Sequence, residues 1–180
     1  MGRLIVSTQI TLDGAMEPIT DWFNPRGSHD LDGQAQLAAS AAALLGGPTF
    51  TGLKGYWEKE SGPEYADRFN AMPKYVASRS LREPLGWNGT LLKGDLAESV
   101  RKVKETTDGV IISYGCGELA YELGKLGLVD EFRFWVHPWV LGGQSVRPFK
   151  GRKLPLAHIA TTTYDTGVVR ISYRARPGST

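Results

Sequence analysis

The sequence predicts an α/β fold with a mostly parallel sheet and an antiparallel end. Apolar or β-branched runs alternate with stretches of helical pattern along most of the 180 residues, and parallel strands need such connections. Two further strand-like runs, 157–164 and 168–174, close the chain around Asp165-Thr166-Gly167, which is the pattern of a hairpin. We expect one domain over residues 1–180, which would bury roughly 70% of the surface of the unfolded chain.

The first half of the chain begins with a predicted buried strand, LIVSTQIT at 4–11, which is rich in β-branched residues. Asp13-Gly14 breaks this strand, and a loop is predicted over 21–30. The alanine-rich run QAQLAASAAALL, 34–45, predicts a helix that leads towards a strand end at Gly46-Gly47-Pro48.

The second half alternates more regularly. Gly94-Asp95 starts a helix in which Asp95 is the expected N-cap, with Glu98 three residues on as in a capping box. The other elements predicted here are strands at 74–78, 90–93, 109–114 and 131–136 and a helix at 118–126.

Composition and charge exclude several classes of function. A net charge of +2 gives no electrostatic footprint for nucleic acid, and one cysteine cannot form an internal disulfide. The first residues lack the apolar run of a signal peptide, and no stretch approaches the roughly 18 apolar residues of a membrane helix. We expect a cytoplasmic protein without a nucleic-acid or membrane partner. The histidines are scattered and no cysteine cluster occurs, so no metal site is predicted.

Two glycine-containing turns are candidate phosphate sites. Tyr114-Gly115-Cys116-Gly117-Glu118 joins a predicted strand to a predicted helix, where backbone N–H groups can face a phosphate. Gly46-Gly47-Pro48-Thr49 has the same character. The alternative for each is a turn without a ligand, with Thr49 as a helix N-cap in the second. Cys116 is predicted to be a small buried thiol rather than a nucleophile.

Polar side chains in two other stretches are further candidates. Ser78 and Arg79 follow a predicted strand and suit a phosphate or a ribose, although an exposed loop explains them as easily. A carboxylate in the loop that holds Trp22 can relay a proton, whereas its structural role would be to cap the next helix. The candidate carboxylates are Asp13, Asp30 and Asp32.

The order of these stretches resembles one family from about Arg3 to Tyr173. TLDGAM, LLGGPTF, PKYVASRSL, LLKGDLAESV, IISYGCGEL, GLVDEF and VHPWVLGG are similar to the dihydrofolate reductase-like family that includes the reductase domain of riboflavin biosynthesis. The likeness is closer to its small stand-alone bacterial members than to true dihydrofolate reductases. It implies a twisted, mostly parallel eight-stranded sheet flanked by helices, with NADPH across the carboxyl ends of the strands.

The resemblance also implies roles for single residues. The turn Gly115–Gly117 would meet the cofactor pyrophosphate, and a non-proline cis peptide would fall at Gly115-Cys116. Ser78 and Arg79 would lie near the adenosine ribose and its 2′-phosphate. The implied cofactor-binding residues are Gln9, Asp13, Gly14, Gly46, Gly47, Pro48, Thr49, Ser78, Arg79, Tyr114, Gly115, Cys116, Gly117, Glu118 and Leu119.

The second glycine turn departs from the family pattern. Relatives usually have Gly-Arg-x-Thr there, but this chain has Gly47 in place of the arginine and loses one N–H donor at Pro48. A lost charge-assisted contact to phosphate costs on the order of 1.5–3 kcal/mol. NADH therefore becomes an alternative to NADPH unless Arg79 compensates.

The predicted activity is NAD(P)H-dependent reduction, by hydride transfer, of a small heterocycle similar to a pterin or a riboflavin precursor. Asp30 is the candidate proton relay, and Trp22, Tyr114 and His137 are candidate substrate residues. The alternative is a non-catalytic protein that binds a nucleotide or a folate-like ligand on the same fold. A homodimer is expected from the resemblance, with the aromatic residues of 132–139 as either its apolar surface or core.

Overall fold

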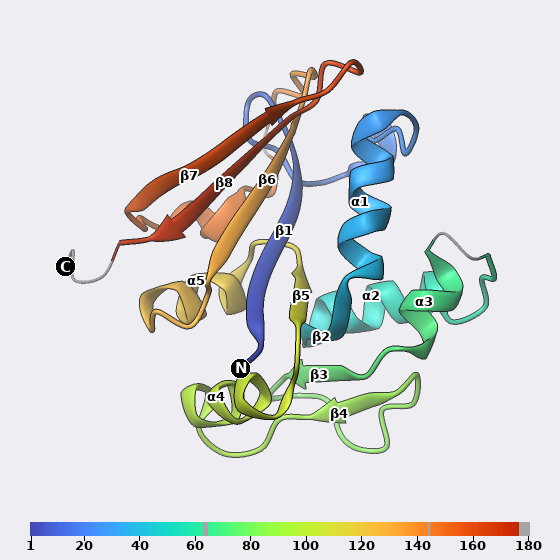
Figure 1. Ribbon diagram of the computed structural model, residues 1–180, viewed down its shortest axis with the longest axis vertical. Coiled ribbons are helices and arrows are strands. Elements are labelled where there is room, and N and C mark those ends of the chain that lie inside the picture. Colours follow the sequence, from blue (N-terminus) through green and yellow to red (C-terminus); the bar gives the residue numbers. More distant parts are fainter. Residues whose placement is uncertain (63–64, 144, 177–180) are drawn as a thin grey trace. The chain divides into compact units, whose positions relative to one another are not determined.

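The structure is a computed structural model that describes residues 1–62, 65–143 and 145–176 (Figure 1). It has an eight-stranded sheet with the strand order β4-β3-β2-β5-β1-β6-β8-β7. In the sequence, helices connect several of the successive strands. The predicted α/β class and the eight strands are therefore confirmed. The chain divides into two compact units, unit 1 with residues 1–4 and 33–114 and unit 2 with residues 5–32 and 115–180. The expectation of a single domain stays a prediction.

Unit 1 holds four parallel strands. Strand β2 (Ser40–Gly46) pairs with both β3 (Lys74–Ala77) and β5 (Val110–Tyr114), and β3 pairs with β4 (Gly89–Leu91). Its helices are α2 (Gly47–Trp57), α3 (Ala66–Ala71) and α4 (Leu96–Thr106), together with the end of α1 (Ser28–Ala38). The side chain of Asp95 accepts a hydrogen bond of 3.0 Å from the backbone N–H of Glu98, which confirms the predicted cap of α4.

The predicted helix over 34–45 is wrong in its second half. Helix α1 ends at Ala38, and residues 40–46 form strand β2. Alanine and leucine favour helices by intrinsic propensity, but β2 has a hydrogen-bonded neighbour on each side. Residues Ala42–Leu45 are each at most 1% exposed, because a central parallel strand is covered on both faces and tolerates a continuous apolar run.

Unit 2 contains the antiparallel end of the sheet. Strand β1 (Arg3–Thr11) is parallel to β6 (Glu131–His137), whereas β8 (Val169–Ala175) is antiparallel to both β6 and β7 (Leu156–Thr163). Figure 1 shows β6, β8 and β7 side by side in orange to red. The predicted C-terminal hairpin is confirmed. Unit 2 also holds helix α5 (Glu118–Lys125) and two short 3-10 turns, Ile19–Asp21 and Pro148–Gly151.

The aromatic residues of β6 are core rather than surface. Phe132, Phe134 and Trp135 are at most 8% exposed, so the strand does not supply the apolar surface that we considered for a dimer. The rings of Phe132 and Phe134 contact Phe149, while Trp135 donates a hydrogen bond of 2.9 Å to the Ser7 hydroxyl. Trp139, beyond the strand, is 52% exposed.

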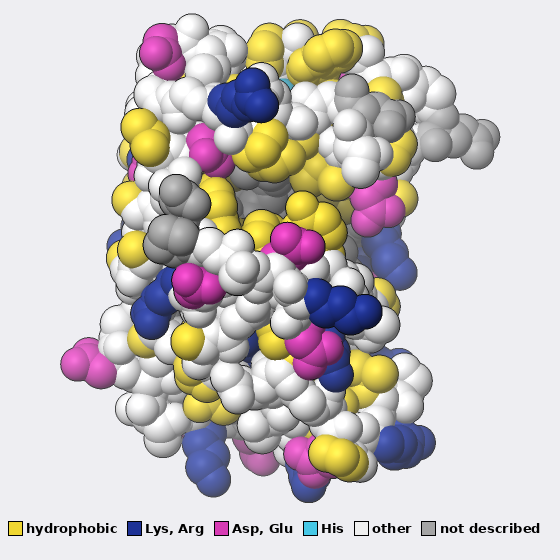
Figure 2. Space-filling view, turned by 90° about the vertical axis from the view of Figure 1, so that its right-hand side faces the viewer, with side chains coloured by type: hydrophobic (Ala, Val, Ile, Leu, Met, Phe, Trp, Pro, Cys, Tyr) yellow, Lys and Arg dark blue, Asp and Glu magenta, His cyan; other side chains and the backbone are white. Residues whose placement is uncertain are grey.

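The face of the molecule in Figure 2 has no dominant sign of charge. On the face in Figure 2, lysine and arginine side chains alternate with aspartate and glutamate, and neither sign gathers into one patch. This distribution agrees with the net charge of +2. None of the helices in the described ranges is long and apolar enough to cross a membrane.

Candidate functional site

In unit 1, the glycine turn Gly46–Thr49 opens a helix directly. Gly46 ends β2 and is itself the N-cap of α2, with an extended backbone and no side-chain hydrogen bond to the helix. Thr49 therefore lies inside the first turn and is not the cap that we considered. The free N–H groups of a helix start are not filled by a capping side chain here, so they suit an anion. Pro48, which has no N–H, sits where helices tolerate it.

Gly47 is glycine because the chain approaches it closely. A Cβ at this position would lie 2.7 Å from the Ser78 hydroxyl oxygen and 3.0 Å from the Ser78 Cβ. Strands β2 and β3 are in register here, with Gly46 opposite Ala77, so the two strand ends bring Gly47 and Ser78 together. A side chain at position 47 therefore requires the loop that follows β3 to shift.

Ser78 and Arg79 begin that loop. The Ser78 hydroxyl accepts hydrogen bonds from the backbone N–H groups of Ser80 and Leu81, at 3.3 and 3.1 Å, which fixes the turn. Arg79 is exposed, and its guanidinium has no carboxylate partner among the described residues. Unit 1 therefore places a cation two residues beyond the end of β3, next in the chain to Ser78, which lies beside the start of α2.

Tyr114 ends β5 in the same unit. Its ring meets that of Phe69 edge-on at 5.7 Å, and burial raises the pKa of its phenol, although a hydrogen bond with Gln36 acts in the opposite direction. Tyr114 is therefore a neutral hydroxyl over the physiological pH range. Its predicted role towards substrate is not tested by these contacts.

In unit 2, the other glycine turn runs from Gly115 into α5. Gly115 has a φ of +80°, and its N–H donates to the Ser7 carbonyl over 3.2 Å. The cis peptide expected at Gly115-Cys116 is wrong, because the cis bonds of the described residues are Glu17-Pro18 and Glu83-Pro84. The left-handed conformation that glycine allows makes this turn with a trans bond.

Of the residues that follow Gly115, Cys116 is buried, whereas Gly117 adjoins open space. Burial raises the pKa of the Cys116 thiol to about 12, which is the behaviour of a structural cysteine. A Cβ on Gly117, the N-cap of α5, would meet no atom within 4 Å, so space adjoins the helix start. Glu118, the first residue of α5, forms an ion pair of 2.9 Å with Arg152, and Leu119 follows it.

The loops after β1 and β6 are joined through Asp13. Its carboxylate accepts hydrogen bonds from the Thr11 hydroxyl and from the backbone N–H groups of Leu141 and Gly142. These bonds, that of Thr11 first, lower the pKa of Asp13 to about 2. Gly14 follows with a φ of +80°. Asp13 is thus an ionised organiser of these loops, which is a role that the sequence pattern did not predict.

His137 lies at the centre of an aromatic group in unit 2. It ends β6, is 2% exposed, and its Nε2 is 2.7 Å from the side-chain oxygen of Gln9. The rings of Trp22, Phe23 and His29 surround it at centroid distances of 5.0, 5.7 and 5.5 Å. Burial, and then the nearby His29, lower the pKa of His137 to about 4, so the imidazole is neutral at pH 7.

Two predicted substrate residues, Trp22 and His137, are therefore brought into contact. His29 also belongs to this group. It was not predicted to be a site residue, because residues 21–30 were predicted to form a loop, whereas His29 lies on α1. Its Nε2 is 3.0 Å from the Asn24 carbonyl, and its Nδ1 is 2.9 Å from the Thr166 hydroxyl. The contact of His29 with the hairpin turn could have been predicted only if the sequence had placed the start of the helix at Ser28.

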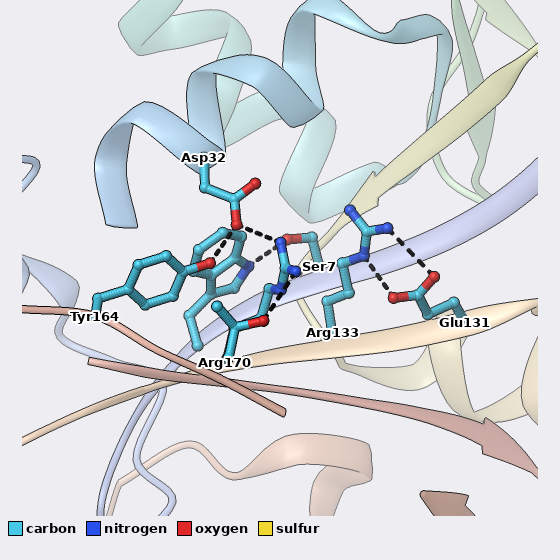
Figure 3. A network of polar contacts seen from close by, with 8 residues as sticks. Ser7, Asp32, Glu131, Arg133, Tyr164 and Arg170 are labelled. Atoms are coloured by element: carbon cyan, nitrogen blue, oxygen red, sulfur yellow. Dashed lines mark hydrogen bonds and ion pairs between the residues drawn. The ribbon is translucent and has the colours of Figure 1, made fainter. Parts of the chain in front are cut away.

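Asp32 is held in the polar network of Figure 3. Its carboxylate accepts hydrogen bonds from Tyr164 and from the guanidinium of Arg170, both from the C-terminal hairpin. Arg170 also lies 5.4 Å from the centroid of the Trp135 ring and bonds Thr162. Neither Asp30 nor Asp32 caps the helix through Gln34, because α1 already begins at Ser28.

Asp30 and Asp32 point to different sides of α1. Two residues span about 200° of a helix, whereas His29 and Asp32, three apart, share a face. Asp32 and His29 both contact the hairpin, so Asp30 lies on the other side, in the first turn of the helix. The assignment of Asp30 as proton relay remains a prediction. The described residues contain no group of three histidine, cysteine or acidic side chains that could hold a metal ion.

The strand order and the antiparallel end define an α/β protein with the dihydrofolate reductase-like fold. The dihydrofolate reductase of Enterococcus faecalis, solved with NADP(H), aligns with 97% of this chain and 97% of its own, with a TM-score of 0.62 and 16% identity. A candidate riboflavin biosynthesis protein from Shewanella sp. PV-4 aligns over 97% and 99%, with a TM-score of 0.73 and 19% identity. Identities this low show a shared fold alone.

The family is shown by the sequence. The RibD C-terminal domain family matches residues 3–170, and the chain belongs to this family. The uncharacterized protein YyaP of Bacillus subtilis strain 168 is 30% identical over 181 residues, which covers 95% of this chain and 94% of the relative. The resemblance read from the ordered motifs is thus confirmed.

Proposed function

We propose that the chain is a nicotinamide-dependent reductase of a small heterocyclic substrate. One observation carries the proposal most directly: in unit 1, the uncapped start of α2 lies beside Ser78, and the next residue is Arg79, whose guanidinium meets no carboxylate of the described residues. Backbone N–H groups, a hydroxyl and a guanidinium at the ends of two parallel strands form a donor set for a phosphorylated ligand.

The residues present fit a dinucleotide cofactor. Gly46 to Thr49, Ser78 and Arg79, all in unit 1, would hold the phosphate-bearing adenosine end. Membership of the RibD C-terminal domain family supports this assignment, and so does the shared fold with a reductase solved with NADP(H). Whether the cofactor is NADPH or NADH depends on how far Arg79 replaces the arginine missing at Gly47.

A bound reduced nicotinamide would supply the hydride. The chain's own part would be to bind and orient the substrate and to exclude water, for which the buried rings of Trp22 and His137 in unit 2 are suited. His137, neutral at pH 7, would accept or donate a hydrogen bond rather than provide a charge. We keep Asp30 as the proposed proton relay and Tyr114 as a further proposed substrate contact. Cytoplasmic location and a homodimer are proposed on the same basis.

Binding of NADPH and NADH, followed by isothermal titration calorimetry, tests the proposal. Wild-type protein should bind at least one of them, and Arg79→Gln should weaken NADPH by roughly 10-fold or more, because one charged hydrogen bond to phosphate is lost. Arg101→Gln, which removes the same charge from the exposed face of α4, should bind as the wild type does.

Equal effects of Arg79→Gln on NADPH and NADH would mean that Arg79 does not meet a 2′-phosphate. Binding of neither cofactor would overturn the reductase proposal. It would favour the alternative of a non-catalytic protein for a folate-like ligand, which a titration with pterins would then examine.

A further inference from the structure

In unit 1, the turn that follows β3 is closed by its own side chains. The Ser78 hydroxyl accepts hydrogen bonds from the backbone N–H groups of Ser80 and Leu81 on one side of the turn. Arg82, which is exposed, closes the other side. Its Nη1 donates to the carbonyl of Arg79 over 3.1 Å and to the carbonyl of Leu81 over 3.0 Å. Two N–H groups and two carbonyl groups of the turn are therefore held by side chains of the same turn.

The same turn is fixed against helix α2. The Ser78 hydroxyl oxygen and a methyl carbon of Leu81 lie 2.7 and 3.6 Å from the place of a Cβ on Gly47, so both side chains face the start of the helix. Further along the loop, Lys54 of α2 donates a hydrogen bond of 2.8 Å to the Leu85 carbonyl. These contacts determine where the turn lies relative to the backbone N–H groups that begin α2.

The two arginines of the turn differ in what their guanidinium groups contact. Arg82 bonds the carbonyls of the turn, whereas Arg79 meets no carboxylate of the described residues. Glu83, the carboxylate next to Arg82 in the chain, forms an ion pair of 2.6 Å with Lys93. Because the backbone of Arg79 is already ordered, a ligand that binds its guanidinium has to immobilise only the side chain, and the entropic cost of binding is lower.

We infer that Arg82 is a positioning residue for the cofactor site. By bonding the carbonyls of Arg79 and Leu81, it holds the backbone from which Arg79 reaches the cofactor phosphate, and it does not touch the cofactor itself. The inference rests on the proposed function, because it takes the ligand of this turn to be the phosphate-bearing end of a nicotinamide cofactor. A residue that positions Arg79 contributes to affinity only while Arg79 is present, whereas a residue that meets the phosphate contributes independently of Arg79.

A double-mutant cycle tests this distinction, with NADPH affinity measured by isothermal titration calorimetry. Arg82→Gln should weaken NADPH about 3- to 10-fold, the effect of roughly one lost hydrogen bond. Arg79→Gln/Arg82→Gln should bind NADPH no more weakly than Arg79→Gln alone, because no guanidinium is left to position. Arg101→Gln, which removes an exposed arginine of α4, is the matched control and should bind as the wild type does. Additive losses in the double variant would overturn the inference, since Arg82 would then act on the ligand directly.

Hydrogen exchange of backbone amides, followed by NMR, tests the role of Arg82 in the turn without any ligand. In Arg82→Gln, the N–H groups of Ser80 and Leu81 should exchange about 3- to 10-fold faster than in the wild type, because the turn opens more often when the bonds to its carbonyls are lost. Arg79→Gln and Arg101→Gln should leave these two rates unchanged. Equal rates in the wild type and in Arg82→Gln would show that Arg82 does not hold the turn, and the inference would be wrong.

The two proposals can fail separately. NADPH binding that does not change in Arg82→Gln would reject the positioning role and leave the reductase proposal intact. A wild type that binds neither NADPH nor NADH would reject the reductase and, with it, the cofactor role of Arg82. Faster exchange at Ser80 and Leu81 in Arg82→Gln would in that case still show that Arg82 holds the turn.

Discussion

Gly47 is a closely constrained position among the predicted cofactor residues. The missing arginine of the family pattern suggests that Gly47→Arg would restore a contact to phosphate. The structure argues against so simple a restoration, because any Cβ at position 47 meets Ser78 at 2.7–3.0 Å. An arginine at position 47 would therefore require a change in the loop after β3 as well, at Ser78.

We therefore predict that Gly47→Ala lowers the free energy of unfolding by about 1–3 kcal/mol, the usual cost of overpacking. Gly52→Ala in the same helix is the control: its Cβ would meet nothing within 4 Å, so it should be neutral or stabilising by up to ~1 kcal/mol. Urea unfolding measures both. The double variant Gly47→Ala/Ser78→Gly should recover most of the loss, and no recovery would show that Ser78 is not the obstacle.

Asp30 and Asp32 provide the second prediction at this scale. If Asp30 relays the proton, Asp30→Asn should lower kcat by a factor of 10²–10⁴ while NADPH binding persists. The measurement is the pH profile of hydride transfer once a substrate is found. Asp32→Asn is the matched comparison, because it loses the same charge from a residue tied to Tyr164 and Arg170. An unchanged profile in Asp30→Asn would remove Asp30 from the mechanism.

Among the elements, α4 tests how directly local sequence determines structure. Its cap was predicted from Asp95 and Glu98, and the hydrogen bond is present at 3.0 Å. Asp95→Ala should lower the free energy of unfolding by about 0.5–2 kcal/mol. Asp108→Ala, which removes an exposed acidic residue just after the same helix, should change it by less than about 0.5 kcal/mol. Thermal or urea unfolding would contradict the prediction if the two variants behaved alike.

Local signals explain which elements were predictable. Caps, glycine stops and β-branched runs located β1, β3, α4, α5 and the hairpin, because each signal acts within a few residues. Strand β2 was misread, since its Ala-rich sequence favours a helix and only its place between β3 and β5 makes it a strand. The start of α1 at Ser28 was missed because Asp30 and Asp32, which were considered as caps of a later helix start, lie inside α1.

The polar contacts of the candidate site were less predictable, because they join residues far apart in the chain. Asp32 meets Arg170 across 138 positions, and Gln9 meets His137 across 128. Neither hydrophobic periodicity nor a sequence motif predicts side-chain contacts between residues so far apart in the chain. The resemblance located the glycine turns, but it could not show that Asp13 organises two loops or that His29 packs on His137.

For the whole molecule, stability should depend on pH through two buried bases. Lys74 is fully buried between the Met72 carbonyl, at 2.8 Å, and the Trp87 ring, at 4.2 Å. Burial lowers its pKa from 10.5 to about 8, so the unfolded chain holds this proton more tightly and stability should rise as the pH increases from 8 to 10.5. Lys74→Met should flatten that rise in urea unfolding, whereas Lys102→Met, exposed on α4, should not.

His137 determines the acidic side of the same profile. Its pKa is lowered from 6.5 to about 4 in the folded protein, so the unfolded state binds more protons between these values. The contribution of His137 to stability should therefore be complete above pH 6.5 and should be lost as the pH decreases towards 4, by about 3 kcal/mol at most. Urea unfolding of the wild type at pH 7, 5.5 and 4.5 measures the loss.

His137→Phe keeps a ring against Trp22, Phe23 and His29 but cannot take up the proton, so its stability should change less over this range. His158→Gln is the control, because His158 lies exposed on β7 and should leave the acid dependence intact. Equal slopes for the wild type and His137→Phe would place the acid sensitivity elsewhere. A smaller slope for His137→Phe would show that His137 causes the acid sensitivity and is therefore neutral in the folded protein at pH 7. A neutral imidazole is the form in which His137 would serve as a hydrogen-bonding residue for a substrate.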